Sequence, residues 1–223
     1  MELPMQYVRN LGMSGALYDQ KTIKTLNLNA AQFAKNKALF ENVSFKGKIY
    51  GTNFGFHMNA FNGIFANRDL LSKYGQPDVV TLFKNNQWTF AKFREICKAV
   101  SRNTGGDSAN DIWGVASEGR MLGVALTSNS GATVSRDASG KYVVNMTSQK
   151  GIAAYEWIRE LYHTDQSFYR TADINATFKM FQDEKAAFIV AWLGEIVTFA
   201  NDCDFDMAFI RSEERRVGKE CRS

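Results

Sequence analysis

Residues 44–75 read SFKGKIYGTNFGFHMNAFNGIFANRDLLSKYG, and residues 186–195, far downstream, read AAFIVAWLGE. The first segment predicts a tight turn at residues 46–48, a strand at 59–66 and then a helix. Asn67 can cap that helix, because its side-chain oxygen can accept hydrogen bonds from the amides of the first turn. Gly75 suits the left-handed residue that ends such a helix. The second segment is a continuous apolar run of strand length, which predicts a strand covered on both faces.

Composition places the chain among globular proteins. It has 223 residues, of which 45% are hydrophobic and 13% aromatic, and this suffices for a core in one large or two small domains. No apolar run approaches the roughly 18 residues that a membrane span needs. The N-terminal residues MELPMQYV lack a charged region followed by an apolar stretch, so no export signal is visible in this sequence.

The last 13 residues, RSEERRVGKECRS, differ from the rest of the chain. They show no apolar periodicity and contribute +2 of the net charge of +4. Residues 211–223 resemble translated sequencing-adapter read-through, so we expect a non-native tail; the alternative is a solvated native tail. Without this tail the remaining cysteines are Cys97 and Cys203, which form no metal-binding spacing and predict no disulfide.

The middle of the chain alternates between helical and strand-like segments. Thr89 is the expected cap of a helix whose buried stripe is Phe93, Ile96, Cys97 and Val100. Residues 134–145 read as a hairpin with its turn at 137–140. A later helix, capped by Ser148 or Thr147, is expected to bury Ile152, Tyr155, Ile158 and Leu161 on one face. Strands are also predicted at 112–116 and 205–210, and this alternation indicates an α/β fold.

Five segments in order along the chain resemble one protein family. They are GKIYG (47–51), IFANRDLL (64–71), NNQWTFAKFREICKAV (85–100), DSANDIWGVA (107–116) and FKMFQDEKAAFIVAWLGEI (178–196). Their order and spacing resemble extracellular solute-binding proteins of family 1, the maltose-binding-like group that serves ABC transporters.

This resemblance implies an α/β fold of the periplasmic-binding-protein type II, with two lobes joined by a hinge. Residues 1–62 would be part of the first lobe, which is incomplete, and residues 63–210 most of the second lobe. Relative to the family, the chain is expected to be an interior fragment whose export signal is absent.

The resemblance also implies a function. The protein would be a solute-binding receptor of an ABC importer, binding a sugar or oligosaccharide between its lobes, and not an enzyme. Its partners would be a small-molecule solute and the membrane subunits of the transporter, with no cofactor and no nucleic acid. We expect an extracellular or periplasmic monomer, either free or lipid-anchored to the cell membrane.

Trp192 is the leading binding residue. It follows a buried strand and precedes Gly194, so we expect it where strand ends open into a crevice. An indole there can stack on the CH-rich face of a sugar, and the resemblance implies a stacking tryptophan at this position. The alternative is a tryptophan packed under a helix.

Polar candidates lie in two other segments. Glu118 and Arg120 follow the strand at 112–116, where they could bind sugar hydroxyls by charge-assisted hydrogen bonds; a solvent-exposed ion pair is the alternative. Asn59 and Asn62 lie at the presumed crossing between lobes, where amides can donate to and accept from hydroxyls. They could instead satisfy the backbone of an irregular strand.

Two aromatic positions, Tyr7 and Phe56, complete the candidate set. Tyr7 lies where the first lobe of the family approaches the ligand, although it could equally be a core residue. Phe56 could line the same cleft. His57, beside it, is better explained as a surface or structural histidine.

Other classes of function find little support. No glycine-rich phosphate loop is present, and the two histidines, His57 and His163, offer neither a metal pair nor a catalytic base beside a nucleophile. We therefore predict no metal site and no catalytic residues. Two alternatives stay open: a sensor domain that binds the same ligands, and a glycan-active enzyme in which Glu118 pairs with a second carboxylate.

Overall fold

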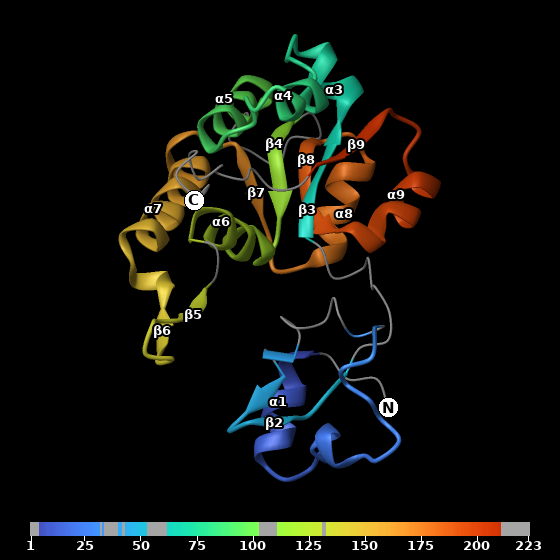
Figure 1. Ribbon diagram of the computed structural model, residues 1–223. Coiled ribbons are helices and arrows are strands. Elements are labelled where there is room, and N and C mark those ends of the chain that lie inside the picture. The colour runs from blue at the N-terminus through green and yellow to red at the C-terminus, as the bar shows by residue number, and fades with distance from the viewer. Residues whose placement is uncertain are drawn as a thin grey trace. The chain divides into compact units, whose positions relative to one another are not determined.

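The structure is a computed structural model, and it describes residues 5–31, 33, 40–41, 43–52, 62–102, 111–130 and 133–210. The chain divides into two compact units, Met1–His57 and Met58–Ser223 (Figure 1). Each unit has a hydrophobic core of its own. The tail at 211–223 lies outside the described residues.

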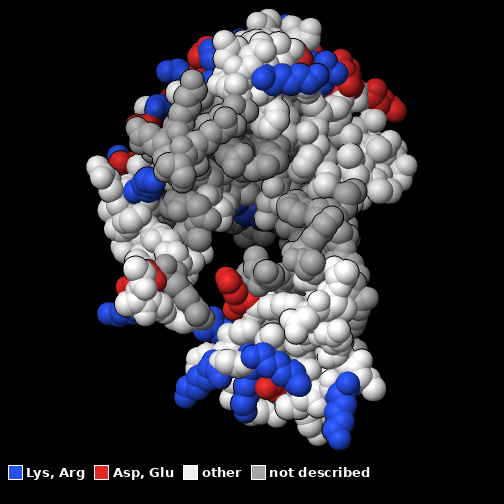
Figure 2. Space-filling view, in the orientation of Figure 1, with Lys and Arg blue, Asp and Glu red and all other residues white. Residues whose placement is uncertain are grey.

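The described part of the first unit contains a helix, α1 (Met5–Met13), a 3-10 helix, η1 (Gln20–Thr22), and a short antiparallel hairpin of β1 (Ser44–Phe45) and β2 (Lys48–Ile49). The tight turn predicted at residues 46–48 is confirmed, because Lys46 and Gly47 adopt positive φ angles of 47° and 75°. Lys and Arg side chains gather on the face of this unit that Figure 2 shows.

The second unit is built on a mixed five-stranded sheet with the order β7-β4-β8-β3-β9 (Figure 1). Strand β4 is parallel to β7 and to β8, whereas β3 is antiparallel to β8 and to β9. The strands are β3 (Asn62–Asn67), β4 (Trp113–Ser117), β7 (Phe168–Arg170), β8 (Ala186–Trp192) and β9 (Met207–Ile210). The predicted α/β class is confirmed.

Helices cover both faces of this sheet. Ile64 and Ala66 of β3 pack into one cluster with residues of α3 (Arg68–Lys73), α4 (Val79–Lys84), α5 (Phe90–Val100) and α6 (Arg120–Ser130). Phe65 points to the other face and packs with α8 (Ile174–Gln182) and α9 (Ile196–Asp202). This alternation follows from the pleat of a strand. Residues of β8 also divide between the two clusters and are buried up to Ala191, which confirms the prediction that this strand is covered on both faces.

Local signals in the sequence fix several helix ends. The side chains of Asn67, Thr89 and Ser148 each accept a hydrogen bond from the first turn of the helix that follows, as predicted. Gly75 adopts a φ of +66° after α3, and the stripe on α5 is fully buried. Gly114 of β4 lies against that stripe, so close that an added Cβ would lie 2.5 Å from the Cα of Cys97.

The remaining elements include one confirmed and one wrong prediction. The hairpin of β5 (Val134–Arg136) and β6 (Tyr142–Val144) forms as expected, followed by the 3-10 helix η4 (Asn145–Thr147). Helix α7 (Gln149–Arg159) continues into a π-helix, η5 (Glu160–Thr164). Leu161 is buried, but Ile152 is 48% exposed, so the expected common buried face is wrong at that position.

Candidate functional site

Three parallel strands, β4, β7 and β8, end at the same edge of the sheet. Glu118 follows β4, Thr171 follows β7, and Trp192 is the last residue of β8. Strand β3 runs the other way and begins here, so Asn62 pairs directly with Trp192. Ligands of α/β proteins commonly bind outside the carboxyl ends of such strands. This edge, the strand-end edge, is therefore the candidate site.

A cation–π contact joins two of the predicted residues. The guanidinium carbon of Arg120 lies 4.3 Å from the centroid of the Trp192 ring system. Arg120 covers part of the indole, yet 44% of Trp192 stays exposed. The exposed part leaves room for a second flat partner, such as a sugar ring.

The carboxylate of Glu118 holds Arg120 at two points. The Nε atom of Arg120 donates to Oε1 of Glu118 over 2.8 Å, and the backbone N–H of Arg120 donates to Oε2 over 2.7 Å. The two side chains are only 14% and 16% exposed, so this ion pair is largely buried. Nη1 of Arg120 is buried and has no hydrogen-bond partner among the described residues.

A pocket of about 830 Å³ opens beside this ion pair. Its walls come from the loop after β4 and the segment after β7: Glu118, Gly119, Arg120, Tyr162, Arg170, Thr171, Ala172 and Ile174. Tyr162, Arg170 and Thr171 were not predicted as site residues from the sequence. The sequence indicates only that a strand could begin near Phe168, because a polar turn comes before it.

The π-helix presents Tyr162 to this pocket. Its two ends are tied to α5, because Arg94 forms ion pairs with Glu160 and with Asp165. The Asp165 side chain is only 1% exposed, and Nη2 of Arg94 also donates to its Oδ1 over 3.1 Å. This pairing with Asp165 and Glu160 raises the pKa of the Arg94 guanidinium further above its ordinary value. Arg94 thus holds the π-helix that carries Tyr162, although Arg94 itself does not line the pocket.

The structure brings together four of the seven predicted binding residues: Trp192, Arg120, Glu118 and Asn62. Asn62 is exposed at its end of β3. Tyr7 belongs to the first unit and is 52% exposed, so it is no core residue there. Asn59 and Phe56, like the neighbouring His57, lie outside the described residues.

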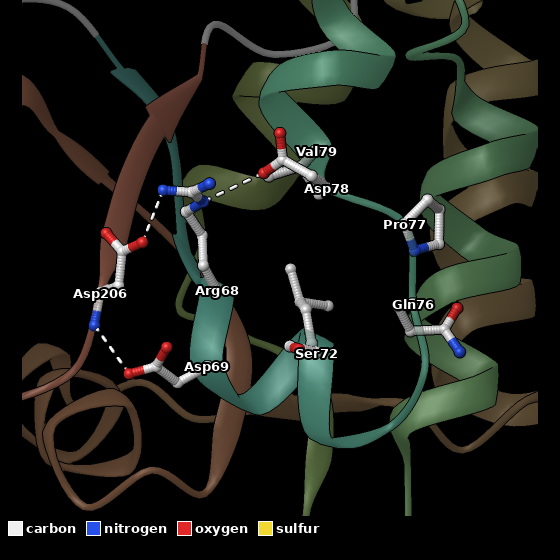
Figure 3. A pocket seen from close by; sticks show the side chains of 9 residues that line it. Arg68, Asp69, Ser72, Gln76, Pro77, Asp78, Val79 and Asp206 are labelled. Atoms are coloured by element: carbon white, nitrogen blue, oxygen red, sulfur yellow. Dashed lines mark hydrogen bonds and ion pairs between the residues drawn. The ribbon is translucent and has the colours of Figure 1, made fainter.

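A second pocket, of about 380 Å³, lies at the opposite end of β3 (Figure 3). Arg68 bridges two carboxylates there: its Nε lies 3.0 Å from Asp78 and its Nη1 2.5 Å from Asp206. The backbone N–H of Asp206 in turn donates to Asp69 over 3.0 Å. These charged groups pair with one another and connect α3 with the start of α4 and with the residue before β9. We therefore interpret this cluster as structural and not as a binding site.

The described residues also bear on other kinds of site. Among them, no group of three or more His, Cys, Asp or Glu side chains could hold a metal ion. None of the helices in the described part of the chain is long and apolar enough to cross a membrane.

Comparison with solved structures identifies the fold. The chain is similar to an ABC substrate-binding protein from Listeria monocytogenes in complex with cycloalternan (16% identity, TM-score 0.66), covering 95% of this chain and 50% of that one. It is also similar to UgpB from Mycobacterium tuberculosis in complex with glycerophosphocholine (14% identity, TM-score 0.65, 91% and 49% covered). A third is the maltotriose-binding protein of Thermus thermophilus bound to maltotriose (15% identity, TM-score 0.64, 97% and 52% covered).

The chain spans about half the length of these structures. No curated protein matches it significantly. The sequence profile of bacterial extracellular solute-binding proteins, however, matches residues 3–213, which is almost the whole chain. The chain therefore belongs to the bacterial extracellular solute-binding protein family, whose members are generally non-catalytic.

Proposed function

We propose that this chain binds a sugar or oligosaccharide at the strand-end edge, as part of the solute receptor of an ABC importer. The observation that carries the proposal is the position of Trp192. Its partly exposed indole lies at the ends of the parallel strands, held by Arg120 and next to a pocket of about 830 Å³. An exposed aromatic face beside a few oriented polar groups is a common design of concave ligand sites.

The polar groups at this edge suit hydroxyl ligands. A carboxylate offers about four acceptor sites and a guanidinium five N–H donors, so the pair formed by Glu118 and Arg120 keeps capacity for further hydrogen bonds. The side-chain amide of Asn62, exposed beside Trp192, can both donate and accept. Two of the similar solved structures were bound to the saccharides cycloalternan and maltotriose, which supports the same class of ligand here.

In this proposal the predicted residues Tyr7, Phe56 and Asn59 also contribute to binding the solute. A ligand that contacts both lobes favours the closed form, because only that form makes both sets of contacts. The membrane subunits of the importer would recognise this closed form. The receptor would act as an extracellular or periplasmic monomer, free or lipid-anchored.

Isothermal titration of the full chain against a carbohydrate panel, with amino acids and polyamines as comparison ligands, tests the proposal. We expect heat of binding with at least one neutral saccharide such as maltotriose, and none with the comparison ligands. Binding of an amino acid or a polyamine without binding of any saccharide would overturn the sugar assignment.

A further inference from the structure

We propose that the solute carries an anionic group, a phosphate or a carboxylate, and that Arg170 binds it. This inference rests on the proposed function, because it concerns the same pocket. It adds a chemical class of ligand and a binding residue that was not predicted from the sequence.

Strand pairing brings Arg170 to the site. Arg170 is the last residue of β7 and pairs with Ser117 of β4, the residue directly before Glu118. Neighbouring strands lie about 4.8 Å apart. Arg170 therefore lines the same pocket as Glu118 and Arg120, from the adjacent strand.

The charges that line the pocket do not cancel. Glu118 neutralises Arg120 through the largely buried ion pair. Arg170 is exposed, and its side chain forms no ion pair or hydrogen bond with any of the described residues. The nearby Asp173 is not part of the pocket wall, and its carboxylate caps α8 by accepting from the backbone N–H of Asn175. Among the described lining residues, Arg170 is thus a positive charge without a partner.

The chemistry of the pocket suits an anionic sugar. A guanidinium presents paired N–H donors that match a carboxylate or a phosphate in a two-point contact. Tyr162 adds an aromatic wall and a phenolic hydroxyl, and Thr171 adds a second hydroxyl. The Thr171 oxygen already accepts from the backbone N–H of Asp173 over 3.1 Å, which leaves its O–H free to donate to the ligand.

The test compares three sugars that differ only at C6, which carries a hydroxyl in glucose, is a carboxylate in glucuronate and carries a phosphate in glucose 6-phosphate. Isothermal titration of the full chain at low ionic strength gives the affinity ratio of each anionic sugar to glucose. We expect a ratio of about 2 to 5 for at least one of the two, since an exposed charge pair contributes only modestly to binding. Comparing glucuronate with glucose 6-phosphate distinguishes a carboxylate from a phosphate ligand. Salt should lower the ratio, because screening weakens exposed charge pairs.

Two variants locate the effect. Arg170→Gln should bring the affinity ratio close to 1, and Arg170→Lys, which keeps the charge but loses the planar fork, should give an intermediate ratio. The matched control is Arg159→Gln, because Arg159 is also exposed but lies outside the pocket. This control should keep the ratio of the unaltered chain.

The outcomes separate this inference from the proposed function. If Arg170→Gln keeps the preference for the anionic sugars, or if neither anionic sugar binds more tightly than glucose, the inference is overturned. Neutral oligosaccharides that bind in that case leave the proposed function intact. If no saccharide of either kind binds, both are overturned together.

Discussion

The guanidinium of Arg120 lies 4.3 Å from the centre of the Trp192 indole, at the ends of two neighbouring parallel strands. Glu118 accepts a hydrogen bond from Nε of the same guanidinium, so it holds Arg120 in its stack on Trp192. A side chain held in this way loses little conformational freedom when a ligand binds, which favours affinity. The stack is the physical basis of the binding account.

Replacing the indole should remove binding without removing the fold. Trp192→Ala is expected to lower the affinity for maltotriose at least ~10-fold, since an aromatic stacking surface contributes on the order of 1–3 kcal/mol in such sites. Trp192→Phe should keep part of the affinity, because a smaller ring still stacks. Isothermal titration measures both. Unchanged maltotriose affinity in Trp192→Ala would show that the ligand binds elsewhere.

The ion pair between Glu118 and Arg120 should contribute to the stability of the fold. Glu118→Gln keeps the size of the side chain but leaves the charge of Arg120 uncompensated in a largely buried position. We expect the free energy of unfolding in urea to fall by about 1–3 kcal/mol. Glu95→Gln is the matched control, since Glu95 also pairs with a cation but is 63% exposed, and should change stability by less than about 0.5 kcal/mol. Equal effects of the two substitutions would argue against the buried pair.

Arg94 and Lys98 offer a similar comparison on α5. Arg94→Met removes the main partner of the buried Asp165 carboxylate and should lower the free energy of unfolding by about 3 kcal/mol. Lys98→Met removes an exposed amine that lies 3.8 Å from the same carboxylate, and should cost less than about 0.5 kcal/mol. Urea unfolding of both variants checks the difference. A larger loss in Lys98→Met would contradict the assignment of Arg94 as the principal partner.

Acid should lower the stability of the fold by protonating Asp78, which lies in the pocket at the opposite end of β3. Burial raises the pKa of the Asp78 carboxyl, but hydrogen bonds from Thr81 and Arg68 outweigh this effect and hold the pKa below its ordinary value. A carboxyl with a lowered pKa stabilises the fold when ionised, and this stability is lost as the pH falls through the folded-state pKa. Stability should therefore fall between about pH 5 and pH 2, and less steeply in Asp78→Asn. Parallel curves of unfolding free energy against pH for the two proteins would contradict this.

Local and periodic features could be predicted from the sequence. The cap of α3 depends on Asn67 and its next few residues, and the buried stripe of α5 repeats at helical spacing, so both follow from neighbours in the chain. Trp192 could be placed at a strand end because the apolar run before it is uninterrupted and a glycine follows soon after.

The rest of the site depends on contacts between distant segments. Arg170 reaches the pocket only because the short strand β7 pairs with β4, and three residues carry too little periodicity to predict that pairing. The exposure of Ile152 could not be predicted from helical spacing either. Within α7 the buried residues are Gly151 and Ala154, and Ile152 lies off this face of the helix.

The central claim, that a saccharide stacks on Trp192, can be measured at the four indole N–H groups of the protein by nuclear magnetic resonance. On titration with maltotriose, the resonance of Trp192 should shift strongly. Those of Trp88, which is buried, and Trp157, whose indole N–H donates to a backbone carbonyl, should stay in place. A Trp192 resonance that does not move while maltotriose saturates the protein would contradict the account.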